Sequence, residues 1–389
     1  MIPRHRAGGT GLLVDFSLSE EQVLLRESVA KYIAENGSVG RHRSLLSCEP
    51  GFDRAAWKLF AELGWLALPF SEDDGGLGGK ATDLMIICEA LGRGLVREPF
   101  LHTAICCGGL IAAAGDAAQR ALYLPAIMGG NAPWAFAFAE GASGYDLTAI
   151  GSTASPGKGG VQISGDKIAV LNGHVAQHLI VTALTDPGDP QSLGLFLVDG
   201  NAPGVRREHF TALDGSHGAN IRFDQVELPA GSSLGRPGAV LATVYRVLDR
   251  VIVAMGAEAL GAMQVLLDAT VDYAKTREQF GQPRGKFQAL QHRMAEMYLK
   301  QEEMRSLLLN AAIQLDDESE GAAAACAALK VKLAEAGRLI SHEAVQLHGG
   351  IGMTDELIVG HLLKRLLLLS KLYGDEDYYL QRYMELQAA

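Results

Sequence analysis

Residues 273–297 read YAKTREQFGQPRGKFQALQHRMAEM, and this stretch decides how the second half of the chain folds. Gly281 and Gly285 interrupt the helical pattern, which predicts one helix, a glycine-broken turn and a second helix. Arg277 and Phe280 fall beside the turn, where a ligand can approach. The alternative for Arg277 is a solvated surface arginine.

Helical periodicity continues on both sides of this turn, and we predict a C-terminal helical bundle over residues 238–389. Residues 15–130 also read as helices, the first of them starting at a capping box at Ser17–Glu20. Residues 1–14 are predicted to be disordered. The predicted bundle helices are Val240–Thr276, Phe287–Leu315 and Ala322–Leu347.

The pattern changes between these two helical regions, over residues 131–237. Short apolar runs bounded by Gly, Pro, Asp or Asn replace the helical period and predict strands of a small β-barrel or sandwich. The fold class is therefore α+β, with an N-terminal helical domain, a middle β-domain and a C-terminal helical bundle. The predicted strands are Trp134–Ala139, Val161–Ser164, Lys167–Leu171, His178–Ala183, Gly194–Val198 and Asn220–Leu228.

Composition narrows the range of partners. The chain has 389 residues and a formal net charge of −11, so nucleic acid or an anionic membrane would repel it at long range. Its uninterrupted apolar runs fall far short of the roughly 20 residues that a membrane span needs, and its start lacks a signal-peptide core. The five cysteines show no CxxC spacing, which indicates reduced thiols and a cytoplasmic location.

His174 and His178 have the i, i+4 spacing of a helical metal pair. They fall in a turn that enters a predicted strand, where residues four apart need not share a face. We therefore predict no metal site.

A second glycine-rich segment, QLHGGIGMT, covers Gln346–Thr354. Glycines allow a ligand to approach the backbone closely. On spacing alone the segment could be an ordinary helix end at Gly349, because helices commonly finish at a glycine. The segment indicates a cofactor site only in combination with Arg277.

Together, the two segments resemble the cofactor motifs of the acyl-CoA dehydrogenase family, and the resemblance spans essentially the whole chain. The tail LYGDEDYY at 372–379 is similar to the small subunit of pimeloyl-CoA dehydrogenase. The resemblance implies FAD as cofactor, with Arg277 meeting its pyrophosphate across a subunit interface and the glycine loop approaching from the neighbouring subunit. The FAD-binding residues that it implies are Arg277, Gln279, Phe280, Gln288, Gln346, Gly349 and Gly350.

The activity implied is α,β-dehydrogenation of an acyl-CoA thioester, as in the oxidation of fatty acids or steroid side chains. Such a reaction removes an α-proton with a positioned base while the flavin takes the β-hydrogen as hydride. The implied partners are an acyl-CoA substrate, an electron acceptor of the electron-transfer flavoprotein type, and further subunits in a homo- or heterotetramer.

Two segments of the middle domain depart from the family pattern. Ala139 and Tyr145 stand where the family usually has hydroxyl residues, in the segment AEGASGYD. In the segment IAVLNG, Ala169 replaces a tryptophan and Leu171 replaces a flavin-facing threonine. The flavin-facing surface of this chain is therefore unusual.

The usual catalytic glutamate is also absent, because Tyr373–Gly374 stands at its position near the C-terminus. Asp249, on the helix before the Arg277 motif, is the only nearby substitute, and Arg250 beside it is a candidate substrate contact. Asp249 could equally be a helix-start cap or the ion-pair partner of Arg246 or Arg250.

Three hypotheses remain at this point. The chain could be a homotetrameric enzyme that uses Asp249 or another acid. It could be one subunit of an α2β2 assembly whose partner supplies the base and the flavin-facing surface. It could also be a flavin-free scaffold, since a fold does not fix a function.

Overall fold

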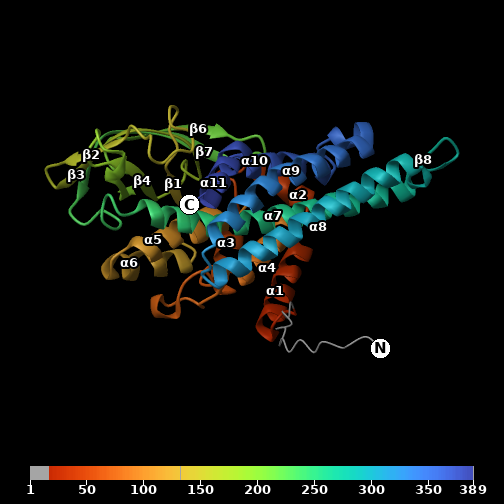
Figure 1. Ribbon diagram of the computed structural model, residues 1–389, viewed down its shortest axis with the longest axis horizontal. Helices are drawn as coiled ribbons and strands as arrows, with labels where there is room; N and C mark the ends of the chain where they lie inside the picture. The colour runs from red at the N-terminus through yellow and green to blue at the C-terminus, as the bar shows by residue number, and fades with distance from the viewer. Residues whose placement is uncertain (1–16, 132, 389) are drawn as a thin grey trace, which may run out of the picture.

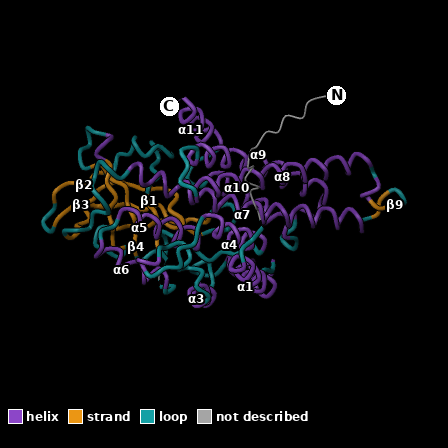
Figure 2. The backbone as a smooth tube through the Cα atoms, turned by 60° about the horizontal axis from the view of Figure 1, so that its bottom comes forward, coloured by secondary structure: helices purple, strands orange, loops and turns teal. Residues whose placement is uncertain are grey.

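The computed structural model describes residues 17–131 and 133–388 (Figure 1). The predicted disorder of residues 1–14 lies outside these residues. A sheet occupies one end of the molecule, and a long pair of helices extends to the other end (Figures 1 and 2). The expected three-part α+β architecture is confirmed by this arrangement.

The N-terminal part is helical, as predicted. Its first helix is capped by Ser19 and not by Ser17, because Ser19 and Gln22 form the reciprocal capping box. Sequence reasoning missed the short helix α2 and the buried π-helical stretch. The elements are α1 (Glu20–Asn36), α2 (Val39–Leu46), α3 (Arg54–Glu62), α4 (Ala81–Arg93), the π-helix Phe100–Gly108, α5 (Gly109–Ala114) and α6 (Ala117–Met128).

The middle part is one curled sheet of seven strands in the order β1-β4-β2-β3-β7-β6, with β5 paired to β4. The two predicted runs at 161–171 form a single strand, β3, whose register shifts at two points. Sequence reasoning missed β2 and β6. The strands are β1 (Trp134–Ala137), β2 (Thr153–Pro156), β3 (Gly160–Leu171), β4 (His178–Leu184), β5 (Leu193–Asp199), β6 (Val205–Thr211) and β7 (His217–Pro229).

The C-terminal bundle is built on α7 (Leu241–Thr276). This helix is long and apolar enough to cross a membrane, but 83% of its most apolar stretch is buried inside the molecule. Two glycines let α4 cross α7 closely, since a Cβ on Gly92 or Gly261 would lie 1.9 Å from a backbone oxygen of the other helix. The remaining elements are β8 (Glu278–Gln279), β9 (Gln282–Pro283), α8 (Gln288–Asp316), α9 (Ala322–His348), the 3₁₀ turn Gly349–Met353, α10 (Ile358–Lys371) and α11 (Glu376–Ala388).

Candidate functional site

A groove of about 660 Å³ lies at the tip of the bundle, where α7 and α9 end. We call it the tip groove. The structure brings both glycine-containing segments of the sequence to this groove, although they are about 70 residues apart. The residues that line it are Tyr273, Arg277, Gln279, Phe280, Arg284, Phe287, Ala289, Leu290, His348, Gly349, Gly350 and Ile351.

One wall of the tip groove is the hairpin that joins α7 to α8. Arg277 is the C-cap of α7: its N–H donates to the Tyr273 carbonyl at 2.8 Å, and its own carbonyl accepts from Arg284 N–H at 2.8 Å. Phe280 at the hairpin tip is 93% exposed and has a φ of 54°. Arg277 is exposed as well, so its guanidinium and the Phe280 ring are both available to a ligand.

The glycine loop forms the opposite wall. Gly349 ends α9 with a φ of 69°, a conformation that L side chains rarely adopt. A Cβ built on Gly349 or Gly350 would meet no atom within 4 Å, so the backbone faces open space. Arg277, Gln279, Phe280, Gly349 and Gly350 therefore line one groove of one chain, while Gln288 and Gln346 are exposed outside its lining.

Asp249 lies near the other end of α7 and is 3% exposed. Its two carboxylate oxygens accept from Arg382 Nη2 of α11, each at 3.2 Å. The prediction that Asp249 pairs with Arg246 or Arg250 was therefore wrong. Burial raises the pKa of Asp249 to about 7, although Arg382 opposes this shift. Arg382 also lies over the Tyr245 ring, 4.2 Å from its centroid.

Arg250 points in a different direction from Asp249, toward the N-terminal helical part. Its Nη2 donates to the Gly79 carbonyl at 2.6 Å, and burial lowers the pKa of its guanidinium. Arg250 therefore holds the loop before α4 against α7. It does not line the groove of about 590 Å³ that borders Arg382 and Tyr245.

The position expected for the catalytic glutamate carries a buried phenol. Tyr373 is 8% exposed, its hydroxyl lies 2.8 Å from His102 Nδ1, and its ring stacks on Phe138 at 5.8 Å. Burial raises the pKa of Tyr373, whereas burial and then Arg365 lower the pKa of His102 to about 3. Both groups are therefore uncharged at neutral pH.

A second aromatic contact joins the middle domain to α11. Tyr145, which replaces the expected hydroxyl residue, packs against Tyr378 of α11 with ring centroids 5.8 Å apart. Leu171, the other substituted position, is 9% exposed and lines a small cavity. A bulky phenol and an aliphatic side chain thus stand at two positions where the resemblance expects small hydroxyl residues.

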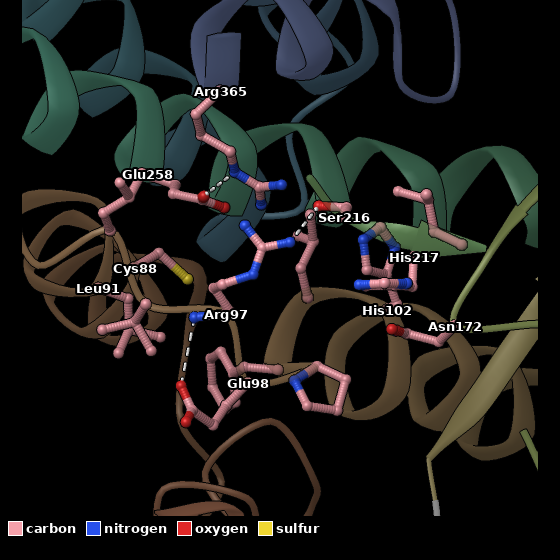
Figure 3. A pocket seen from close by; sticks show the side chains of 16 residues that line it. Cys88, Leu91, Arg97, Glu98, His102, Asn172, Ser216, His217, Glu258 and Arg365 are labelled. Atoms are coloured by element: carbon pink, nitrogen blue, oxygen red, sulfur yellow. Dashed lines mark hydrogen bonds and ion pairs between the residues drawn. The ribbon is translucent and has the colours of Figure 1, made fainter. Parts of the chain in front are cut away.

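That small cavity, of about 50 Å³, lies where the three parts of the chain meet (Figure 3). Figure 3 shows Arg365 directed at Glu258 and Arg97 directed at Ser216. Arg365 Nε lies 2.6 Å from Glu258 Oε1, and its Nη1 lies 3.0 Å from Asp214 Oδ2. Burial alone would raise the pKa of Asp214, but Arg365 and Arg97 hold it below its ordinary value. The cavity is therefore filled by an ion network and leaves room for only a few water molecules.

The two spaced histidines face different partners. His174 Nε2 lies 3.0 Å from the Pro50 carbonyl, whereas His178 stacks on Trp134 at 4.5 Å. Over residues 17–131 and 133–388, no group of three or more His, Cys, Asp or Glu side chains could hold a metal ion.

Sequence reasoning missed Arg382, Tyr273, His348 and Arg284. Arg284 lies inside the segment that drew attention to Arg277, and its charge next to the turn was the available signal. Tyr273 lies in the same segment and His348 in the glycine-rich segment, but their stacking, like the Asp249–Arg382 pair, joins distant parts of the chain, which local spacing does not reveal.

Three domain profiles match the chain in order. They are the N-terminal, middle and C-terminal domains of acyl-CoA dehydrogenase, over residues 19–131, 135–226 and 243–385. The mitochondrial isovaleryl-CoA dehydrogenase of Pongo abelii is 30% identical over 356 residues, which cover 89% of this chain and 84% of that protein.

Solved structures agree with these matches. A variant of the Tcur3481-Tcur3483 steroid ACAD is 31% identical, with a TM-score of 0.85 over 96% of this chain and 99% of that chain. PigA with FAD and proline is 25% identical, with a TM-score of 0.88 over 96% of this chain and 99% of that chain. The chain belongs to the acyl-CoA dehydrogenase family, whose members use FAD.

Proposed function

We propose that this chain is a subunit of a heteromeric FAD-dependent acyl-CoA dehydrogenase. In this assembly it supplies the tip groove as a clamp for FAD, and a partner chain of the same fold supplies the flavin-facing strands and the catalytic base. One observation carries the proposal: the position expected for the catalytic carboxylate holds Tyr373, a buried and uncharged phenol in contact with His102.

Removing an α-proton from a thioester requires a positioned base with a pKa near the working pH. The Tyr373 hydroxyl keeps its proton at neutral pH, because burial raises its pKa. His102 is a weak base, since its pKa is lowered to about 3. This pair is therefore suited to holding the α10–α11 connection against Phe138 and unsuited to proton abstraction.

The residues that fit FAD lie at the far end of the molecule. Arg277 is an exposed guanidinium that can donate two parallel hydrogen bonds to a diphosphate, and Gly349 and Gly350 leave the backbone open to it. When bound, FAD supplies the hydride acceptor for the β-hydrogen of the acyl chain. The residues of the tip groove bind and orient the cofactor.

The tip groove and the flavin-facing strands of one chain cannot serve the same FAD. Asp249 and Arg277 are 28 residues apart on α7, which corresponds to about 42 Å along a helix. Figures 1 and 2 place the β8–β9 hairpin and the sheet at opposite ends of the molecule. This separation supports an oligomer in which the tip groove of one chain reaches the middle domain of another.

The aromatic contact between Tyr145 and Tyr378 favours a heteromer over a homomer, because it places bulk at a position where the resemblance expects a flavin contact. The paired designation of the related Tcur3481-Tcur3483 steroid ACAD agrees with a two-chain assembly. The proposed ligand of the assembly is an acyl-CoA, and the proposed electron acceptor is of the electron-transfer flavoprotein type. The five free cysteines, four of them buried, support the proposal of a cytoplasmic location.

A homomeric enzyme with Asp249 as base is the second candidate, and the observation that favours it is a buried carboxylate on α7 in contact with Arg382, whose pKa burial raises to about 7. Asp249→Asn separates the two candidates. If Asp249 is the base, the change should lower turnover by about 100-fold to 10,000-fold while flavin stays bound. If the partner supplies the base, turnover of the assembled protein should stay nearly intact.

The decisive experiment compares the chain purified alone with the chain co-expressed with acyl-CoA dehydrogenase-like products of neighbouring genes. We expect the visible flavin band and acyl-CoA oxidation in the assembled protein, and little of either in the isolated chain. Vigorous turnover by the isolated chain would overturn the proposal. Flavin-free assemblies with every partner tested would support the scaffold hypothesis instead.

A further inference from the structure

The two walls of the tip groove come from separate elements, and their spacing has to be fixed by something between them. Arg277 and the hairpin tip belong to the end of α7, whereas Gly349 and Gly350 follow α9. The β8–β9 pairing joins Glu278 to Pro283 and Gln279 to Gln282. These contacts fix the shape of the hairpin but leave its distance from the glycine loop undetermined.

A pair of stacked rings in the lining of the groove joins its two walls. The rings of Tyr273 and His348 lie 4.7 Å apart at an interplanar angle of 20°. Tyr273 lies one helical turn before Arg277, and its backbone carbonyl accepts from the backbone N–H of Arg277 at 2.8 Å. His348 immediately precedes Gly349. The Tyr273 ring thus lies one helical turn before Arg277, and the His348 ring belongs to the residue next to Gly349.

The His348 ring is itself held in place. It is 5% exposed, and its Nδ1 lies 2.7 Å from the Ala344 carbonyl. A carbonyl only accepts, so Nδ1 carries the proton and the ring orientation is set. A Cβ on Gly352 would lie 2.9 Å from the His348 Cβ, so the following turn packs tightly on this residue. A fixed imidazole gives Tyr273 a fixed surface to stack on.

Arg284 adds a third member on the hairpin side. Its guanidinium carbon lies 6.0 Å from the centroid of the Tyr273 ring, within the range of a cation–π contact. Its backbone N–H closes the hairpin by donating to the Arg277 carbonyl at 2.8 Å. The aromatic stack and the hairpin are therefore connected through side chains as well as through the backbone.

We propose that Tyr273 and His348 are positioning residues that hold Arg277 at a fixed distance from the glycine loop, and so shape the tip groove for a nucleoside diphosphate. The chemistry of the groove defines that ligand class: Arg277 and Arg284 supply positive charge, open glycine backbone allows close approach, and Phe280 supplies an exposed ring for a base. The inference rests on the proposed function, in which the diphosphate is that of FAD.

The test measures FAD binding to the deflavinated assembled protein. Tyr273→Leu removes the stack, and we expect about 2-fold to 12-fold weaker FAD binding, the range of an aromatic pair. Tyr273→Phe keeps the ring and is the matched control, with unchanged binding. His348→Leu should resemble Tyr273→Leu. Thermal unfolding of each variant reports whether the fold itself has been damaged.

The readout that a purely structural role would not move is coupling to Arg277. In Tyr273→Leu/Arg277→Ala, the loss should be smaller than the product of the single losses, because displacing an absent guanidinium costs nothing. Multiplicative losses, or a Tyr273→Leu variant with normal FAD affinity, would overturn the inference while leaving the proposed function in place. If Arg277→Ala alone left FAD binding unchanged, the proposed function itself would fail.

Discussion

The ionisation of Asp249 is the property of this chain that can be tested most directly. Its carboxylate is 3% exposed, and burial raises its pKa to about 7 from an ordinary value of 3.8. The folded protein therefore binds this proton more tightly than the unfolded chain does. Stability from this group is greatest below about pH 4 and falls as the pH rises to about 7.

The shift of about three pKa units corresponds to about 4 kcal/mol of stability that is lost across this pH window. For a chain of 389 residues, an unfolding entropy of about 2.1 cal/mol/K per residue gives about 0.8 kcal/mol/K in total. The loss should therefore lower Tm by about 5 °C between pH 4 and pH 8, if the chain unfolds cooperatively.

Asp249→Asn removes the titration and keeps the shape of the side chain. The variant also alters the contact with Arg382, which can shift Tm at every pH, so only the pH dependence of the difference between wild type and variant is informative. We expect the Tm of the wild type, measured relative to the variant, to fall from pH 4 to pH 8. The exposed Asp268→Asn on the same helix is the matched control and should leave the slope unchanged. Parallel curves for wild type and Asp249→Asn would refute the reasoning and show that Arg382 keeps the carboxylate ionised.

Two further predictions concern the bundle and the assembly. Lys330 donates to the carbonyls of Leu369 and Leu372, and burial lowers its pKa. The Tm of the wild type should therefore rise relative to that of Lys330→Met as the pH increases from 7 toward 10. A Tm difference that stays constant with pH would contradict a buried neutral amine. The molar mass of the flavin-loaded protein from light scattering should be that of an oligomer, and we expect a tetramer. A monomer that holds FAD tightly would contradict a groove that serves another chain.

The sequence predicts those parts of the fold that have strong local periodicity. The helix ending at Asn36 and the helix Ala117–Met128 were placed within a residue or two, because caps and apolar spacing act within a few residues. The π-helix Phe100–Gly108 was missed, since eight of its nine residues are buried and therefore show no amphipathic period. The edge strand β6 was missed because five of its seven residues are polar or charged.

The candidate site divides in the same way. The cation and the glycines of the tip groove were predicted because each lies in a short segment with a specific pattern. The partner of Asp249 was not predicted, because Arg382 is 133 residues away on α11, which packs against α9 and reaches α7 through this ion pair. Local spacing rules offered only Arg246 and Arg250, which lie within a turn of Asp249.

The length of α7 explains why the two ends of the molecule differ in the groups that they offer to a cofactor. Its first half packs against the N-terminal helices and carries the buried Asp249 that pairs with Arg382. Tyr145 and Tyr373 stand where the resemblance expects a smaller hydroxyl residue and a carboxylate. The last turn of α7 carries Tyr273 and Arg277 into an open groove that Arg284 and the glycine loop also line. A homomeric enzyme would need both ends intact, because every copy would supply a clamp and receive one. A subunit that only supplies the clamp is free to fill its own flavin-facing surface with Tyr145, Tyr373 and Tyr378, and a rigid helix of 36 residues keeps that change away from Arg277.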